Sequence, residues 1–247
     1  PDLNCDALVE ECDEDNEEVT RLDIDLLSVE FLVDLLALVE TTSKKRNQTS
    51  ELNGVELEGI IAGFDPIYQT NHKDLWHRGF PVDRLDQREN LKYIIKEVKV
   101  DVQADFWNGD PDIDAIARIM LKPKCVFDKK LFPFYSNKIS PFNSQNTFLD
   151  ASLLKYYFLF PDQGRMHDIW ASYYLQYIKK INVIYSEPSV FQDRNLHDLS
   201  VDLKNELIGL KYSSAIINSM LKKKFKINRF FSKKSIKAYK LYLKHFK

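Results

Sequence analysis

The 247-residue chain contains few glycines and cysteines, seven and three respectively. Cys5, Cys12 and Cys125 form no C-x-x-C pair and no dense framework, which argues against a disulfide scaffold and against a structural zinc site. There is no run of about 20 apolar residues, so no segment is expected to span a bilayer. No signal peptide is evident. Because the chain starts at Pro1 rather than at a methionine, we expect an upstream part to be missing.

Several catalytic signatures are also absent. The sequence contains no G-x-G-x-x-G, no G-x-x-x-x-G-K-[ST], no G-x-S-x-G and no H-E-x-x-H. Dehydrogenases, P-loop enzymes, ordinary α/β hydrolases and zincins are therefore disfavoured. Aromatic residues are abundant at 13%, which suits either an aromatic core or a surface that faces sugars.

The net charge of −2 conceals a strong separation of charge along the chain. Residues 2–18 carry acids without Lys or Arg, whereas residues 211–247 carry lysines and Arg229 without any acid. Such asymmetry reports on local fields and partners rather than on fold. For the basic tail we expect a solvated or membrane-facing cationic helix, with a peripheral membrane or protein contact. No nucleic-acid motif accompanies it, so nucleic acid is not an expected partner.

Hydrophobic periodicity predicts alternating strands and helices over the first two thirds of the chain, followed by an appended helical part. Strands are expected at 8–12, 55–64, 98–106 and 181–185, the last bounded by Glu187-Pro188. Helices are expected at 22–39, 90–96, 112–121, 150–158, 167–180, 197–210, 213–225 and 233–246.

Polar side chains that could bind a ligand occur in five segments. Residues 11–16 (ECDEDN) place Asp13 and Asp15 after the expected first strand, where paired carboxylates suit Mn²⁺ or Mg²⁺. The alternative is a solvated acidic terminus. The other four segments are 77–81 (HRGFP), 108–118 (NGDPDIDAIAR), 141–147 (PFNSQNT) and 164–170 (GRMHDIW).

Each of these four segments also has an ordinary structural explanation. Gly79 and Pro81 could simply form a turn, and one acid of 108–118 is expected to cap a helix. The amide-rich loop 141–147 could satisfy its own backbone. Asp168 could cap a helix, and Trp170 is more often a core residue than a sugar platform.

Taken in order, the segments 75–81, 108–118, 141–147 and 164–170 resemble the STELLO-type family, which includes Golgi proteins linked to cellulose synthase assembly. The chain is more distantly similar to the reversibly glycosylated polypeptides, the UDP-arabinopyranose mutases. Their Arg-Gly-aromatic-Pro segment also precedes an Arg-Glu pair, which here is Arg88-Glu89. The resemblance covers about residues 75–206, and the order and spacing of the segments make it specific.

The resemblance implies a GT-A-like α/β fold, a nucleotide-sugar ligand and a divalent metal. Only a short stretch precedes Asp13, whereas a GT-A fold places a nucleotide-binding half before its acidic motif. The chain is then either a fragment or a divergent protein without its donor half. In both cases this chain by itself is not expected to suffice for sugar transfer. We expect a GT-A-like domain over residues 1–210 and a basic helical tail over 211–247.

The leading hypothesis is a metal-dependent glycosyltransferase-like protein that uses a UDP-sugar and a glycan acceptor, in the Golgi or the cytoplasm. The rival is a non-catalytic scaffold that recruits a polysaccharide synthase or a membrane through the tail. A weaker alternative is a nucleotide-sugar mutase in which Arg78 or Arg88 carries sugar. The assigned residues are Asp13 and Asp15 for Mn²⁺ or Mg²⁺; Asp112, Asp114 and Asp168 for catalysis; and Arg78, Arg88, Asp110, Arg118, Asn143, Gln145 and Trp170 for substrate.

Overall fold

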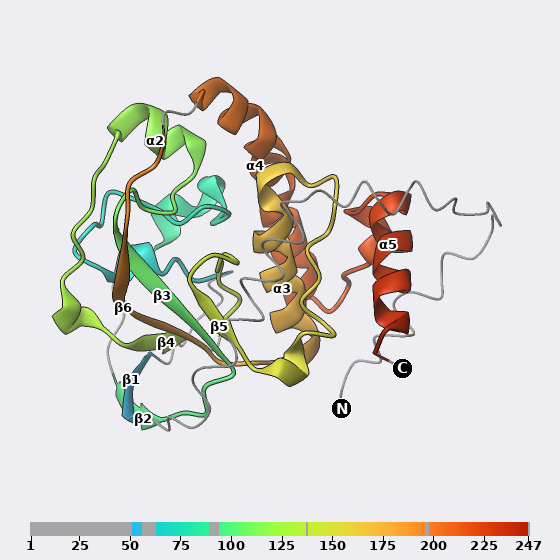
Figure 1. Cartoon of the computed structure of the whole chain (residues 1–247), viewed down its shortest axis with the longest axis horizontal. Helices are drawn as coiled ribbons and strands as arrows, with labels where there is room; N and C mark the ends of the chain where they lie inside the picture. The colour runs from blue at the N-terminus through green and yellow to red at the C-terminus, as the bar shows by residue number, and fades with distance from the viewer. Residues whose placement is uncertain (1–50, 56–62, 89–93, 137, 196–197, 247) are drawn as a thin grey trace.

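The structure is a computed structural model that describes residues 51–55, 63–88, 94–136, 138–195 and 198–246. It contains a six-stranded sheet with helices beside it (Figure 1). The order across the sheet is β2 (Ile94–Glu97), β1 (Glu51–Val55), β4 (Phe134–Ser136), β6 (Val183–Gln192), β3 (Val102–Gly109) and β5 (Thr147–Leu149). The pairs β1–β4 and β3–β6 are parallel and the other neighbours are antiparallel. The expected mixed α/β class is therefore confirmed.

Some predictions fall on other residues. Asp13 and Asp15, the expected strand 8–12 and the expected helix 22–39 lie outside the described residues. The same is true of most of the expected strand 55–64 and of Glu89.

The parallel pair β3–β6 forms the part of the sheet that carries the polar segments. Val102 and Ala104 are buried on either side of the half-buried Gln103, as the sequence pattern predicts, but β3 begins at Val102 rather than at residue 98 and continues to Gly109. Strand β6 likewise extends beyond Glu187-Pro188, where the sequence predicts its end. The register shifts between Asp105 and Trp107, opposite the stretch of β6 that contains Pro188. A proline cannot donate a ladder hydrogen bond, and this local irregularity accommodates it within the strand.

Several expected helices were wrong in kind or extent. Residues 94–97 form strand β2 rather than a helix. Only residues 151–153 of the expected helix 150–158 are helical, as a single 3-10 turn. The segments 197–210 and 213–225 form one continuous helix, α4 (Leu199–Leu221). Gly209 lies inside α4 and does not end it. A Cβ at this position would overlap the Met166 side chain, so the glycine allows α4 to pack closely against Met166.

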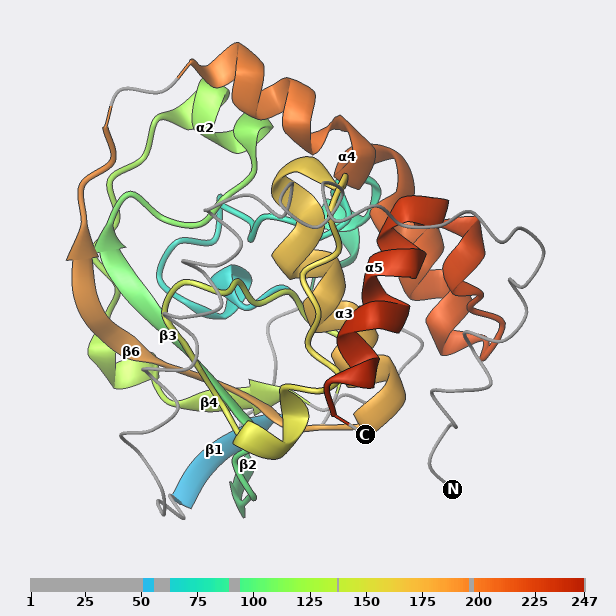
Figure 2. The same cartoon turned by 45° about the vertical axis from the view of Figure 1, so that its right-hand side comes forward.

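Helix α3 (His167–Lys179) lies between the sheet and the C-terminal helix α5 (Figures 1 and 2). Ala171 and Leu175 belong to the core that contains strands β3 and β6, whereas Trp170 and Tyr173 belong to a second core with α4 and α5. Apolar residues surround a helix on all sides when the helix is buried. Helix α3 therefore holds the two cores together.

The basic tail is packed on one face and charged on the other. Helix α5 (Lys233–Lys244) buries Ile236, Tyr239 and Leu243 in the second core, and Phe158 stacks obliquely on Tyr239 with ring centroids 5.2 Å apart. The exposed lysines of α5 are Lys233, Lys234, Lys237 and Lys244. The expected domain boundary at 210–211 falls inside α4, whose Ile208 and Ile216 both contact this core. Among the described residues, none of the helices combines the length and the apolarity needed to cross a bilayer.

Gly109, the last residue of β3, allows the ends of β3 and β6 to approach each other closely. Its φ is +90° and an added Cβ would overlap the carbonyl oxygen of Gln192. Gly63 also has a positive φ, +104°, but the nearest atom to its Cβ position lies 3.6 Å away. We therefore expect Gly109→Ala to lower the free energy of unfolding by about 2 kcal/mol more than Gly63→Ala does. Urea unfolding followed by circular dichroism measures both, and equal midpoints would contradict this close approach.

Candidate functional site

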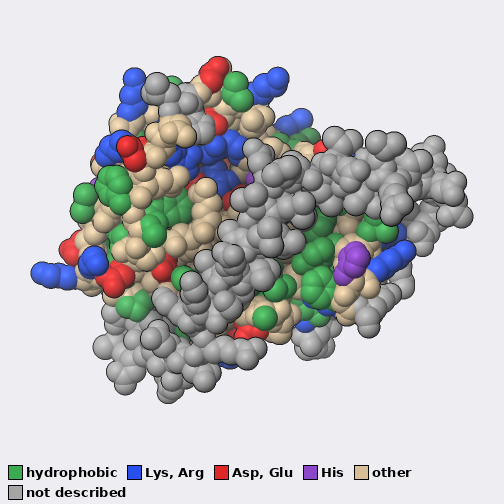
Figure 3. Space-filling model, viewed as in Figure 1, with side chains coloured by type: hydrophobic (Ala, Val, Ile, Leu, Met, Phe, Trp, Pro, Cys, Tyr) green, Lys and Arg blue, Asp and Glu red, His purple; other side chains and the backbone are tan. Residues whose placement is uncertain are grey.

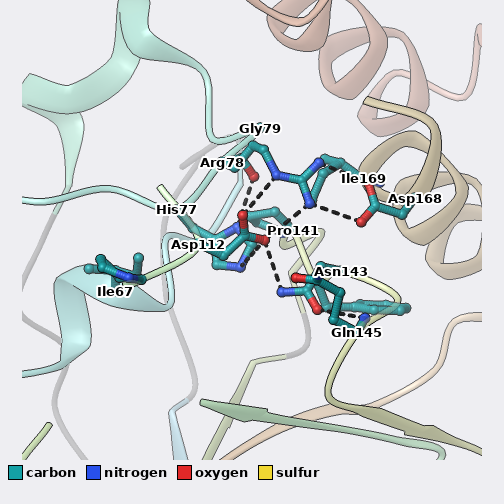
Figure 4. Close-up of polar contacts among 12 residues, drawn as sticks. Ile67, His77, Arg78, Gly79, Asp112, Pro141, Asn143, Gln145, Asp168 and Ile169 are labelled. Carbon is teal, nitrogen blue, oxygen red and sulfur yellow. Dashed lines mark hydrogen bonds and ion pairs between the residues drawn. The ribbon is translucent and has the colours of Figure 1, made fainter. Parts of the chain in front are cut away.

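Arg78 is buried between two carboxylates that are distant in sequence (Figure 4). Its Nε and Nη2 donate to Asp112 Oδ1 and Oδ2 at 2.8 and 3.1 Å. Its Nη1 and Nη2 donate to Asp168 Oδ1 and Oδ2, both at 2.9 Å. Nη1 also donates to the carbonyl oxygen of Arg165. The guanidinium is therefore fully engaged, an arrangement in which planar bidentate pairing is strongest.

This pairing fixes the charge of all three groups. Desolvation by burial raises the pKa of Asp112, but the Arg78 charge outweighs it and the net pKa lies well below the usual range. The pKa of Asp168 is lowered by the same balance of burial and Arg78. Burial acts to lower the pKa of Arg78, yet the two carboxylates raise it well above its ordinary value. Both carboxylates therefore stay ionised at neutral pH.

The turn at Gly79 holds Arg78 in place. Its φ is +91°, and an added Cβ would overlap the Ile169 side chain on α3. The Tyr173 hydroxyl donates to the Gly79 carbonyl oxygen at 2.7 Å. The turn is thus seated directly on α3, the helix that carries Asp168.

The loop 141–147 closes the network from the opposite side. Asn143 Nδ2 donates to Asp112 Oδ2 at 2.9 Å, and the backbone nitrogen of Ser144 donates to Asp168 Oδ2 at 3.3 Å. The backbone nitrogen of Gln145 donates to Asn143 Oδ1 at 2.9 Å, which orients that amide. The Gln145 side chain itself is exposed. Asn143 thus joins the buried network, and Gln145 contributes through its backbone.

A pocket opens beside this network. It encloses about 350 Å³, counting the space open to solvent. Its polar lining comes from His77, Asp105, Asp112 and Asn143. Its apolar lining is Ile67, Ala104, Phe106, Trp107, Pro111, Phe127, Phe142 and Tyr185. The pocket combines hydrogen-bond acceptors with aromatic walls at the site of the β3 irregularity.

The other acids of segment 108–118 have separate partners. Asp114 is the cap of helix α2 (Ala115–Leu121): its Oδ1 accepts from the Ala117 nitrogen at 2.9 Å, and its Oδ2 accepts from the Trp76 indole. Burial raises the pKa of Asp114. Asp110 accepts from Lys124 Nζ at 2.8 Å. The segment therefore divides its acids between a cap, an ion pair with the exposed Lys124 and the Arg78 network, to which Asp112 belongs.

Arg118 and Arg88 do not line the pocket. Arg118 is buried and its Nη2 donates to the Pro111 carbonyl oxygen at 2.6 Å. Arg88 Nη1 pairs with Asp65 Oδ2 at 3.0 Å, and its guanidinium lies 4.4 Å from the centroid of the Tyr68 ring. Asp65 connects this pair to the site because its Oδ1 accepts from the His77 backbone nitrogen at 3.1 Å.

Trp170 lies away from the pocket. It is fully buried in the second core, where its indole nitrogen donates to Ser213 Oγ at 3.1 Å. Its ring packs edge-on against Phe231 with centroids 5.7 Å apart. No part of the ring is exposed for a sugar in this structure.

The metal assignment concerns residues that the structure does not describe, Asp13 and Asp15. Within the described ranges, no group of three or more His, Cys, Asp or Glu side chains is placed to hold a metal ion.

Sequence reasoning missed Asp105, Arg165 and Glu206. Asp105 is buried in the middle of β3, and a charged residue between apolar neighbours was the available signal. Arg165 pairs with two acids of α4, Asp202 at 3.1 Å and Glu206 at 2.7 Å. Glu206 also accepts from the Ala115 nitrogen at 2.6 Å, and these partners are too distant in sequence to be predicted from local patterns.

Comparison with known proteins assigns no family: no protein-family model matches the chain, and no curated protein matches it in sequence.

Proposed function

We propose that the chain is a glycosyltransferase-like protein of the GT-A type that binds a nucleotide-sugar, with the pocket beside Arg78 holding the sugar. One observation carries the proposal. The four segments that resemble the STELLO-type family, which span about 90 residues between Arg78 and Asp168, supply the members of one buried network. Segments chosen for their order along the chain thus converge in one network, and the first three of them also line the pocket beside it.

The chemistry of the pocket supports a sugar ligand. Asp105, Asp112 and Asn143 offer oxygen acceptors for hydroxyl groups. Phe106, Trp107 and Tyr185 are among the apolar lining residues, and such rings provide the faces on which a sugar can pack.

The pKa directions refine the roles of the acids. A general base works best when its pKa lies near the operating pH. Asp112 and Asp168 have lowered pKa values and are weak bases. We assign to Asp112 the binding of a hydroxyl group and the stabilisation of developing positive charge, and to Asp168 the positioning of Arg78. Asp114 Oδ1 caps α2, its Oδ2 accepts from the Trp76 indole, and Asp114 does not line the pocket, which favours a structural role there.

The mutase alternative receives less support. An arginine that carries sugar needs a nitrogen free to react, and the Arg78 nitrogens are held by Asp112, Asp168 and Arg165. Arg88 is similarly paired with Asp65.

The resemblance also supplies the metal and the compartment in this proposal. Mn²⁺ or Mg²⁺ held by Asp13 and Asp15 would neutralise the diphosphate of a UDP-sugar. A glycan is the proposed acceptor, and the Golgi or the cytoplasm is the proposed compartment.

The scaffold alternative is supported by α5. Its apolar face is packed in the core while Lys233, Lys234 and Lys237 remain exposed. Any contact with a membrane or a polysaccharide synthase through this face would therefore be electrostatic and sensitive to salt.

Calorimetric titration with UDP-sugars, with and without Mn²⁺, tests the proposed function. We expect binding that Mn²⁺ strengthens and that Asp105→Asn weakens by about tenfold, the effect of one charged hydrogen bond. Asp86→Asn, the same change at an exposed position, is the matched control. Negligible binding of every UDP-sugar in both conditions, with any upstream residues included, would refute the proposal. Equal UDP-sugar affinities for wild type and Asp105→Asn would mean that the sugar does not bind in this pocket.

A further inference from the structure

Arg194 follows the end of β6 and is fixed there by the end of β3. Its backbone nitrogen donates to Asp110 Oδ2 at 2.8 Å. The Asp110 backbone nitrogen donates in turn to the Gln192 carbonyl oxygen at 2.9 Å. Strands β3 and β6 are parallel, so both residues lie at the carboxyl edge of the sheet, where α/β proteins commonly bind ligands.

The Nε atom of Arg194 lacks a partner of the kind that the neighbouring arginines have. Its Nε is buried, and it has no hydrogen-bond partner among the residues that the structure describes. Arg78 and Arg165, by contrast, are each paired with two carboxylates. A buried guanidinium nitrogen without an acceptor is unfavourable, so an acceptor supplied by a ligand would complete it.

The surrounding charges favour an anion at this place. Desolvation by burial lowers the pKa of Arg194, attraction from Asp112 opposes this, and repulsion from Arg118, Arg165 and Arg78 lowers the pKa further. Arg118 donates through Nη2 to the Pro111 carbonyl oxygen, but its contact with an acid is loose, since its Nη1 lies 3.9 Å from Asp110 Oδ1. On the face drawn in Figure 3, Lys and Arg side chains gather in a recess between α2 and α4.

We propose that Arg194, assisted by Arg118, binds the diphosphate of the nucleotide-sugar; this inference rests on the proposed function. The sequence places Arg78 among the substrate-binding residues, but that guanidinium is occupied by Asp112 and Asp168. Asp112 lines the pocket and also interacts electrostatically with Arg194. A phosphate at Arg194 would therefore lie beside a sugar in the pocket, and a guanidinium can hold two phosphate oxygens at once.

Binding of inorganic pyrophosphate, UDP and uridine to the whole chain tests this site by calorimetry at low and high salt. We expect Arg194→Ala to weaken pyrophosphate and UDP by about tenfold or more, which is the loss of one charged bidentate contact. Arg194→Lys is expected to restore part of the affinity, since it keeps the charge without the fork. Uridine should bind wild type and Arg194→Ala equally. Arg229→Ala, the same change at an exposed position, is the control, and thermal melting verifies that each variant is folded.

Two results would overturn the proposal: wild type that fails to bind pyrophosphate, or Arg194→Ala that binds it as tightly as wild type does. A further comparison separates this proposal from the proposed function. If UDP-sugars bind wild type and Arg194→Ala equally but depend on Asp105, the anion site is wrong and the sugar pocket stands. In the opposite case, Arg194→Ala weakens pyrophosphate binding, but UDP-sugars bind no more tightly than UDP and their affinity is unchanged by Asp105→Asn. The sugar pocket is then wrong and the anion site stands.

Discussion

Replacing Arg78 with methionine is expected to lower the free energy of unfolding by about 3–5 kcal/mol at neutral pH, the usual cost of breaking a buried ion pair by removing one partner. The change leaves Asp112 and Asp168 buried with their charges uncompensated. Methionine has a similar length and no charge, so the main loss is electrostatic rather than one of packing. Arg78→Lys should fall between wild type and Arg78→Met, because an ammonium cannot pair bidentately with both carboxylates.

The pH dependence of this effect has a definite sign. In wild type the pKa values of Asp112 and Asp168 are lowered. Their contribution to stability is therefore present above the unfolded-state pKa and is lost as the pH falls through the folded-state values. Without Arg78, burial dominates and raises the pKa of both carboxyls, so the variant is stabilised by protonation. The difference from wild type should therefore shrink as the pH is lowered from 7 toward 5.

Urea unfolding at a series of pH values measures this difference. Arg229→Met, the same change at an exposed position, should be nearly neutral at every pH. Adding Asp112→Asn and Asp168→Asn to Arg78→Met should recover part of the stability, since no buried charge is then unpaired. A pH-independent loss, unaffected by the two asparagines, would mean that Arg78 acts through packing alone.

The sequence indicated the site better than it indicated the contacts within it. Arg78, Asp112, Asn143 and Asp168 all lie in segments selected for order and spacing, and the structure places them in one network. Which acid of segment 108–118 caps α2 was not decidable from spacing, because several acids precede the helix and each could accept from its first turn. The cap is Asp114, which leaves Asp112 for a partner 34 residues away.

The fold was predictable where periodicity was strong and local. Helix α3 begins and ends almost where its aromatic pattern predicts. The failures have tertiary causes. Pro188 remains in β6 because the parallel ladder with β3 is irregular opposite it, and Gly209 remains in α4 because Met166 fills the space beside it. Arg194 was not singled out because a lone arginine carries no pattern; its significance comes from the arginines and carboxylates that distant segments place around it.

Trp170 provides the second large effect, and it separates a core residue from a sugar platform. Trp170→Ala should lower the free energy of unfolding by about 3–5 kcal/mol, as truncation of a fully buried aromatic does. The ring is completely buried and its indole nitrogen donates to Ser213. Trp170→Phe keeps most of the apolar volume and loses this hydrogen bond, so a smaller loss of about 1–2 kcal/mol is expected.

The two Trp170 variants should be compared with Phe191→Ala, which truncates a ring that is 70% exposed and should change stability little. Thermal and urea unfolding report the stabilities, and titration of the folded fraction reports UDP-sugar affinity. If Trp170 is a core residue, Trp170→Phe lowers the stability and Trp170→Ala lowers it further. The affinity of the folded molecules for UDP-sugar is then unchanged in both variants. Near-wild-type stability combined with lost affinity would instead require the ring to face the ligand. The aromatic walls of the pocket would then have to extend from Phe106, Trp107 and Tyr185 into the core between α3 and α4.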